Sequence, residues 1–194
     1  FVATVDNLAR EQAPASAWPV QPTGQRFITD GPQGGTQSIA ANNAARCWNA
    51  YVAGDQDRDQ GEPLSIKQET DWAISHHGID SSRVFVTGLS AGGAMTNVML
   101  ATYPDVYKAG GEMEGGPYKC ASAAGAQTTA CNAGTVVLTP QQWGDKVRAA
   151  TSWTGPWPRV SVWHGTADTT VNYQNLVETV KQWTNVQGID QTPD

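Results

Sequence analysis

The sequence predicts an α/β domain, built on a mostly parallel sheet with helices on both faces. Apolar, strand-like runs alternate along the chain with helix-like stretches, which is typical of this class. In addition, residues 88–92 read Gly-Leu-Ser-Ala-Gly between one such run and a helix-compatible stretch. With 194 residues, the chain is long enough to bury a core of its own, and we interpret 1–194 as a single domain.

The first part of the chain contains few clear elements. Residues 5–12 are compatible with a short helix and 27–28 with a short strand, whereas the polar, Gly-rich and Asn-rich stretch 30–45 is expected to be a long loop. Residues 62–76 show the spacing of an amphipathic helix, with Pro63 suited to its first turn and a glycine beyond its end.

The remainder repeats a strand and helix alternation. Strands are predicted at 83–87, 109–115 and 159–164, and helices at 91–103, 140–150 and 172–184, with most of 116–158 as loop. Glu112 and Glu114 make the second of these strands less apolar than a buried parallel strand should be, and the sequence does not explain them.

Composition excludes several classes of partner. The formal net charge is −6 and no basic cluster occurs, which argues against nucleic acid and anionic membranes as partners. No apolar run reaches the length of a membrane span. Charged residues make up only 15% of the chain and there are eight Trp, which is typical of a secreted, extracellular protein. The chain opens at Phe1 without a signal peptide, so we expect a mature form or a fragment.

The three cysteines agree with an oxidising compartment. Cys120 and Cys131 flank a loop of small residues that has little apolar content of its own, and a disulfide between them would stabilise it by about 2–3 kcal/mol. Cys47 then remains as a free thiol or as half of a bond to a partner elsewhere. Three reduced cysteines in a cytosolic protein are the alternative. No metal site and no cofactor are predicted, because apart from the adjacent His76 and His77 no Cys or His lies at ligand spacing.

Ser90 is the candidate nucleophile. It lies in the turn between a strand and a helix, and small residues are needed around it because its backbone is strained there. A serine hydroxyl becomes a good nucleophile only when a base takes its proton and an acid orients that base. The backbone N–H of Ala91 would donate to the oxyanion that forms on the substrate.

Asp168 is the candidate acid. It follows the predicted strand 159–164 in a loop at the carboxyl end of the sheet, which would face the same crevice as Ser90. The alternative is an aspartate that forms a turn or caps the helix after it.

The base is not evident, because no histidine follows Asp168. His76 and His77 lie near the end of the helix before the nucleophile strand, at the opposite end of that strand from Ser90. His164 lies at the correct end but only four residues before Asp168, and we interpret it chiefly as a support for the acid.

Six segments together resemble a known family. The chain is similar to the secreted esterases that include polyhydroxybutyrate depolymerases, acetylxylan esterases and feruloyl esterases, within the α/β hydrolase superfamily. The segments are Arg46-Cys-Trp-Asn49, Gly54-Asp-Gln56, Val84-Phe-Val-Thr-Gly-Leu-Ser-Ala-Gly-Gly-Ala-Met95, Ala101-Thr-Tyr-Pro-Asp105, Pro117-Tyr-Lys-Cys120 and Trp163-His-Gly-Thr-Ala-Asp168.

The resemblance implies an α/β hydrolase in which Ser90 attacks an ester carbonyl and Asp168 is the acid. The substrate would be an acyl ester of plant polysaccharide or a polyhydroxyalkanoate polyester. The family's first core strand, with a His-Gly-Cys loop that supplies a second oxyanion donor, and its catalytic histidine after the last strand have no match here. Cys47, in the Arg-Cys-Trp segment, resembles a cysteine that in the family forms a disulfide with the cysteine of that first loop. We therefore expect a chain that lacks both ends of the family's domain.

Two alternatives remain open. The chain could be an inert relative that binds carbohydrate or polymer, for which Trp48 beside a polar loop is the candidate surface aromatic. It could also be an enzyme whose base is His164 or comes from another chain.

Overall fold

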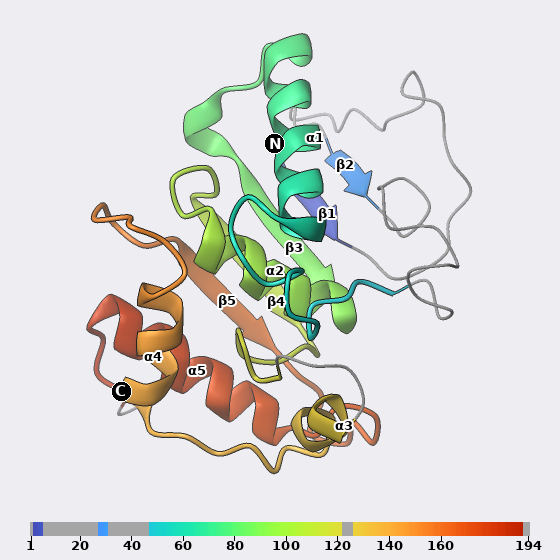
Figure 1. Ribbon diagram of the computed structural model, residues 1–194, viewed down its shortest axis with the longest axis vertical. Coiled ribbons are helices and arrows are strands. Elements are labelled where there is room, and N and C mark those ends of the chain that lie inside the picture. The colour runs from blue at the N-terminus through green and yellow to red at the C-terminus, as the bar shows by residue number, and fades with distance from the viewer. Residues whose placement is uncertain (1, 6–26, 31–46, 122–125, 192–194) are drawn as a thin grey trace.

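The sheet has five parallel strands, and the elements around it follow the α/β pattern (Figure 1). The computed structural model describes residues 2–5, 27–30, 47–121 and 126–191. The strand order is β2-β1-β3-β4-β5. These strands are β1 (Val2–Val5), β2 (Phe27–Asp30), β3 (Phe85–Leu89), β4 (Ala109–Met113) and β5 (Arg159–Trp163).

Five α-helices lie in the described part of the chain. They are α1 (Gly61–His77), α2 (Ala91–Thr102), α3 (Ala126–Asn132), α4 (Pro140–Arg148) and α5 (Gln174–Gln187). A 3₁₀ turn, Ser81–Arg83, leads from α1 into β3. Helix α2 packs against β3 and β4, while α4 and α5 pack together beside β5 (Figure 1).

The core lies between α2 and the sheet face that carries Val86. Residues 92–102 of α2 are buried without exception, because this helix crosses the middle of the domain. Its side chains meet Ile66 of α1 on one side and Trp183 of α5 on the other. Helix α2 is therefore held from several directions, which fixes the position of its first turn.

Most predicted elements agree with the structure, with shifts of one to three residues at their ends. The strand expected at 83–87 begins two residues later, because Asp80 caps the 3₁₀ turn through its side chain. The strand expected at 27–28 extends to Asp30. Of the helix expected at 5–12, Val5 instead ends β1, and the rest falls outside the described residues, as does the loop predicted from 31 to 45. Helix α3 was not expected.

Strand β1 occupies the sheet position directly beside β3, for which the sequence offered no candidate. It pairs with β3 from Val2 opposite Phe85 to Val5 opposite Gly88. The chain leaving β1 therefore starts from the same edge of the sheet as the turn after β3.

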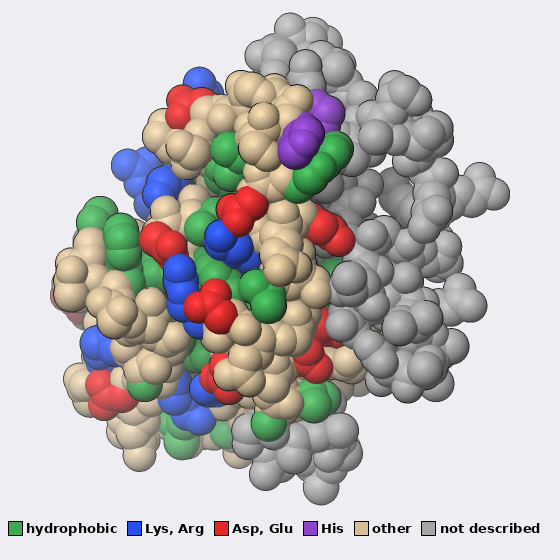
Figure 2. Space-filling model, turned by 45° about the horizontal axis from the view of Figure 1, so that its top comes forward, with side chains coloured by type: hydrophobic (Ala, Val, Ile, Leu, Met, Phe, Trp, Pro, Cys, Tyr) green, Lys and Arg blue, Asp and Glu red, His purple; other side chains and the backbone are tan. Residues whose placement is uncertain are grey.

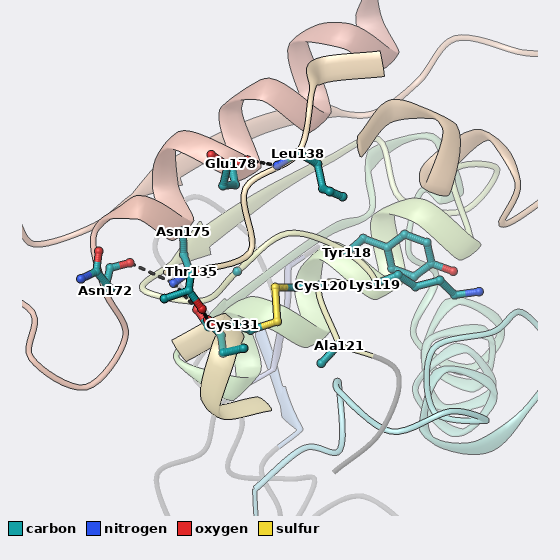
Figure 3. Close-up of a disulfide and its surroundings, with 12 residues drawn as sticks. Tyr118, Lys119, Cys120, Ala121, Cys131, Thr135, Leu138, Asn172, Asn175 and Glu178 are labelled. Carbon is teal, nitrogen blue, oxygen red and sulfur yellow. Dashed lines mark hydrogen bonds between the residues drawn. A yellow bond between two sulfur atoms is a disulfide. The ribbon is translucent and has the colours of Figure 1, made fainter. Parts of the chain in front are cut away.

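The predicted disulfide between Cys120 and Cys131 is confirmed (Figure 3). It connects the segment after β4 to α3, with 6.0 Å between the two Cα atoms. The Asn175 side-chain amide donates to the carbonyl oxygen of Cys131 at 2.8 Å, which attaches α3 to the start of α5. The bond therefore fixes a segment that few apolar contacts would hold.

Acidic and basic side chains alternate on the surface shown in Figure 2, without a continuous basic patch. Arg58, Lys119 and Arg148 each form an ion pair with a neighbouring aspartate. Among the helices of the described residues, none has the length and hydropathy needed to span a membrane.

Candidate active site

Ser90 lies in a strained turn between β3 and α2. Its φ is 59° and its ψ is −123°, a conformation that non-glycine residues rarely adopt. The Ser90 N–H donates to the carbonyl oxygen of Met113 at the end of β4 (2.8 Å), and its own carbonyl oxygen accepts from the N–H of Ala94 (3.0 Å). The sheet and the helix thus hold the turn on both sides. This is the geometry that the Gly-Leu-Ser-Ala-Gly motif predicts.

Two glycines allow the turn to lie this close to β4. A Cβ atom on Gly93 would approach the carbonyl oxygen of Met113 to 2.5 Å, and one on Gly115 would approach the backbone nitrogen of Ala94 to 2.5 Å. Both distances are far inside van der Waals contact. Any side chain at either position would therefore push α2 away from the strand ends and displace Ser90.

Asp168 lies in the loop after β5, where two backbone groups hold its carboxylate. Oδ1 accepts from the N–H groups of Thr170 (2.8 Å) and Val171 (3.0 Å), whereas Oδ2 lies 3.4 Å from Nε2 of His164. The Val171 hydrogen bond is the main cause that lowers the pKa of Asp168, and the Thr170 bond adds to it. Asp168 is thus ionised at neutral pH. Asp168 thus stabilises the turn through Oδ1, while Oδ2 takes no part in these two backbone hydrogen bonds.

His164 is positioned to support this loop. Its side chain is fully buried, and Nε2 lies 2.8 Å from the carbonyl oxygen of Val171, to which a protonated Nε2 donates. The ring meets Tyr173 edge to face at 6.1 Å. A histidine whose side chain is fully buried and whose Nε2 is engaged by the loop is poorly placed to take a proton from a substrate-facing serine. This agrees with the interpretation of His164 as a support for Asp168.

Ser90 and Asp168 line the same pocket, whose volume is about 350 Å³. The pocket lies at the carboxyl ends of β3, β4 and β5, where Leu89, Met113 and Trp163 are aligned in register. The described residues that line it are Leu89, Ser90, Glu114, Gly165, Ala167, Asp168, Thr170 and Val171. The structure therefore brings together the two residues that sequence analysis assigned to nucleophile and acid.

Glu112 is buried beneath the Ser90 turn, and sequence analysis did not identify this role. The side chain is 1% exposed; Oε1 accepts from the N–H of Gly115 at 2.5 Å, while Oε2 is buried without a hydrogen bond to any described residue. Burial is the largest cause that raises the pKa of Glu112 to about 7; the Gly115 bond opposes the rise and Glu114 adds to it. Burial, and secondarily Glu112, also raises the pKa of the Tyr51 hydroxyl.

The Glu112 pKa predicts how stability depends on pH. A carboxyl whose pKa rises from 4.5 to about 7 on folding contributes stability that is complete below pH 4.5 and is lost as pH rises through 7, about 3 kcal/mol in all. We expect the free energy of unfolding of Glu112→Gln to fall less between pH 5 and pH 8 than that of the wild type; Glu62, whose pKa burial raises to about 8, contributes to the fall in both proteins. Urea unfolding at the two pH values measures the difference, with Glu69→Gln on α1 as the matched control. Parallel pH profiles for Glu112→Gln and the wild type would contradict the assignment.

The prediction that Trp48 is a surface aromatic is wrong. Its side chain is 2% exposed and belongs to the core cluster with Ile66 and Val98, because the segment that carries it packs against α1 and α2. Trp48 therefore offers no face to a polymer. Cys47 beside it is half-buried, and burial raises the pKa of its thiol.

His76 and His77 end α1, and the chain then enters β3 at its amino end. Histidine side chains are visible at one place on the surface in Figure 2. His76 stacks on Trp72 with 4.5 Å between the ring centroids. Both histidines lie at the opposite end of β3 from Ser90, as expected from their position in the sequence.

Ala91 is the first residue of α2, so its N–H belongs to the turn whose donors the helix itself leaves unbonded. Its part in an oxyanion hole stays a prediction. Within the described residues, no group of three or more His, Cys, Asp or Glu side chains could hold a metal ion.

Comparison with known proteins identifies relatives of the chain. Residues 46–190 match the model of the prolyl oligopeptidase family, and residues 1–66 match that of a protein family of unknown function, DUF3014. Poly(3-hydroxyalkanoate) depolymerase C of Paucimonas lemoignei is 48% identical over 93% of this chain and 42% of its own length. Feruloyl esterase B of Talaromyces stipitatus is 39% identical over 79% of this chain and 45% of its own length.

A solved structure supports the same relationship. The acetyl xylan esterase from Aspergillus awamori superposes with a TM-score of 0.77 at 29% identity, covering all of this chain and 72% of that protein. The chain thus spans less than half of the length of the two sequence relatives and most of the solved domain.

Proposed function

The chain belongs to the prolyl oligopeptidase family of α/β hydrolases and is homologous to polyhydroxyalkanoate depolymerase, acetylxylan esterase and feruloyl esterase, and on this basis we propose that it is a serine carboxylic ester hydrolase. The resemblance predicted from the six sequence segments is confirmed. The observation that carries the proposal is Ser90, held at positive φ between β3 and α2, in one pocket with Asp168.

In the proposed reaction, Oγ of Ser90 attacks the ester carbonyl carbon and forms a tetrahedral intermediate. The N–H of Ala91 donates to its oxyanion, the alcohol leaves, and water then releases the acid from the acyl enzyme. Asp168, with Oδ1 fixed by the loop, would orient the imidazole through Oδ2.

The mechanism also needs a general base that takes the proton of Ser90. The three histidines of the chain are His76, His77 and His164, and none lines the pocket among its described residues. We propose that the imidazole beside Asp168 comes from outside these 194 residues.

We further propose that the substrate is an ester of a polymer, either acylated plant polysaccharide or polyhydroxyalkanoate. The names of the homologous proteins support this substrate class. A secreted, extracellular location is proposed as well, since the disulfide between Cys120 and Cys131 is typical of oxidising compartments.

Hydrolysis of 4-nitrophenyl acetate tests the proposed function. We expect the 194-residue chain alone to be slow, and a chain extended to include the next histidine encoded downstream to be active, with activity falling below about pH 6–7 as the base becomes protonated. Activity that stays flat down to pH 4 would contradict a Ser-His mechanism. Two inert forms that nevertheless bind xylan or polyester would favour a binding protein.

A further inference from the structure

Glu114 places a carboxylate in the pocket beside Ser90. It directly follows β4 and has a φ of 51°, and its N–H donates to the carbonyl oxygen of Trp163 at 2.8 Å. This bond continues the pairing between β4 and β5 by one residue and holds the turned backbone in place. The positive φ ends the strand alternation, so that Glu112 points under the Ser90 turn while Glu114 lines the pocket.

Gly165 gives the Glu114 side chain its space. A Cβ atom on Gly165 would lie 3.3 Å from Oε1 of Glu114, so the carboxylate lies close over the loop that leads to Asp168. Within the described residues, the Glu114 carboxylate makes no hydrogen bond and no ion pair. The backbone of Glu114 is thus held by a hydrogen bond, while no ion pair among the described residues neutralises its carboxylate.

The charged side chains that line the pocket are all acidic among the described residues. Among its described lining residues, only Glu114 and Asp168 are charged, and both are acidic. In the proposed mechanism an imidazolium forms beside Asp168 and balances its charge, whereas nothing in the described lining balances Glu114. Basic side chains nearby in sequence are engaged elsewhere; Lys119, for example, pairs with Asp57.

We propose that Glu114 is a specificity-determining residue that selects uncharged acyl groups at Ser90 and rejects esters that carry a carboxylate. The inference rests on the proposed function and adds that the acyl group of the substrate is uncharged. Two like charges a few ångströms apart at the edge of a protein repel strongly, and the repulsion weakens with added salt. An acyl chain that ends in a carboxylate would then be transferred to Ser90 more slowly than an uncharged acyl chain of the same length. The acid product would also leave quickly.

A matched pair of esters tests the inference. 4-Nitrophenyl hexanoate and 4-nitrophenyl hydrogen adipate have acyl chains of equal carbon number, and only the adipate ends in a carboxylate. In the active, extended protein we expect kcat/KM to favour the hexanoate by about tenfold or more at low salt. In Glu114→Gln we expect this preference to fall several-fold, chiefly through faster adipate hydrolysis. Glu69→Gln on α1 is the control, and its preference should equal that of the wild type.

An unchanged preference in a folded Glu114→Gln variant would overturn the inference while leaving the proposed function intact. If that variant does not fold, the salt dependence of the wild type decides: a preference that does not decrease between 20 mM and 500 mM NaCl overturns the inference. If neither ester is hydrolysed, the proposed function fails. The inference is then decided by binding, because phenylboronic acid should bind the pocket more tightly than 4-carboxyphenylboronic acid, and equal affinities would overturn it.

Discussion

Replacing Ser90 with alanine is expected to lower kcat/KM for 4-nitrophenyl acetate by about 10⁴-fold or more, because no other group of the site can form the acyl enzyme. Alanine retains the backbone bond to Met113 and removes only Oγ, so the free energy of unfolding should stay close to that of the wild type. Steady-state kinetics of the extended, active protein measure the effect, and a fluorophosphonate probe that labels the wild type should not label the variant.

Ser152→Ala is the matched control for this experiment, since Ser152 is exposed in the loop between α4 and β5. It should retain full activity. If Ser90→Ala hydrolyses the ester at a tenth of the wild-type rate or faster, then Ser90 is not the nucleophile.

Asp168→Asn should cause the second largest loss, about 10³-fold to 10⁴-fold in kcat. The asparagine side-chain oxygen can still accept from the N–H groups of Thr170 and Val171, so the loop should keep its shape. What is lost is the negative charge that holds the imidazole in its active tautomer and stabilises its protonated form.

The alternative role of Asp168, as a turn former alone, predicts a different outcome. If the two backbone bonds were its whole function, Asp168→Asn would keep activity within about tenfold, because amide and carboxylate oxygens both accept hydrogen bonds. Asp145→Asn on α4 serves as the control, since Asp145 is exposed and its partner Arg148 lies in the same helix.

Local patterns in the sequence predicted most of the secondary structure. The apolar spacing within 62–76, the apolar run 83–87 and the helix-compatible stretch 91–103 identified α1, β3 and α2, since each pattern depends on residues a few positions apart. Helix α3 lacks such a pattern, because it is a short run of small and polar residues held by the disulfide and by Asn175.

The sequence did not predict how far Trp48, Glu112 and Glu114 are buried. Trp48 was expected at the surface because it lies beside a polar loop, yet it packs into the core against α1 and α2. Glu112 and Glu114 were unexplained because a buried parallel strand should be apolar. In a regular strand, residues 112 and 114 would also lie on the same face of the sheet. The positive φ of Glu114 breaks that rule, and no local signal in the sequence predicts it.

The sequence by itself predicted the α/β class from the alternation of strands and helices, and the family from six short segments. It also proposed Ser90 and Asp168 as the candidate nucleophile and acid, because each lies in a short motif next to a predicted strand. Only the tertiary structure decided that β4 lies between β3 and β5, that Ser90 and Asp168 share a pocket, and that one glutamate lies beneath the turn while the other lines that pocket. The physical reason is that exposure, burial and charge environment are set by which distant segments pack together, and that packing is a property of the whole domain.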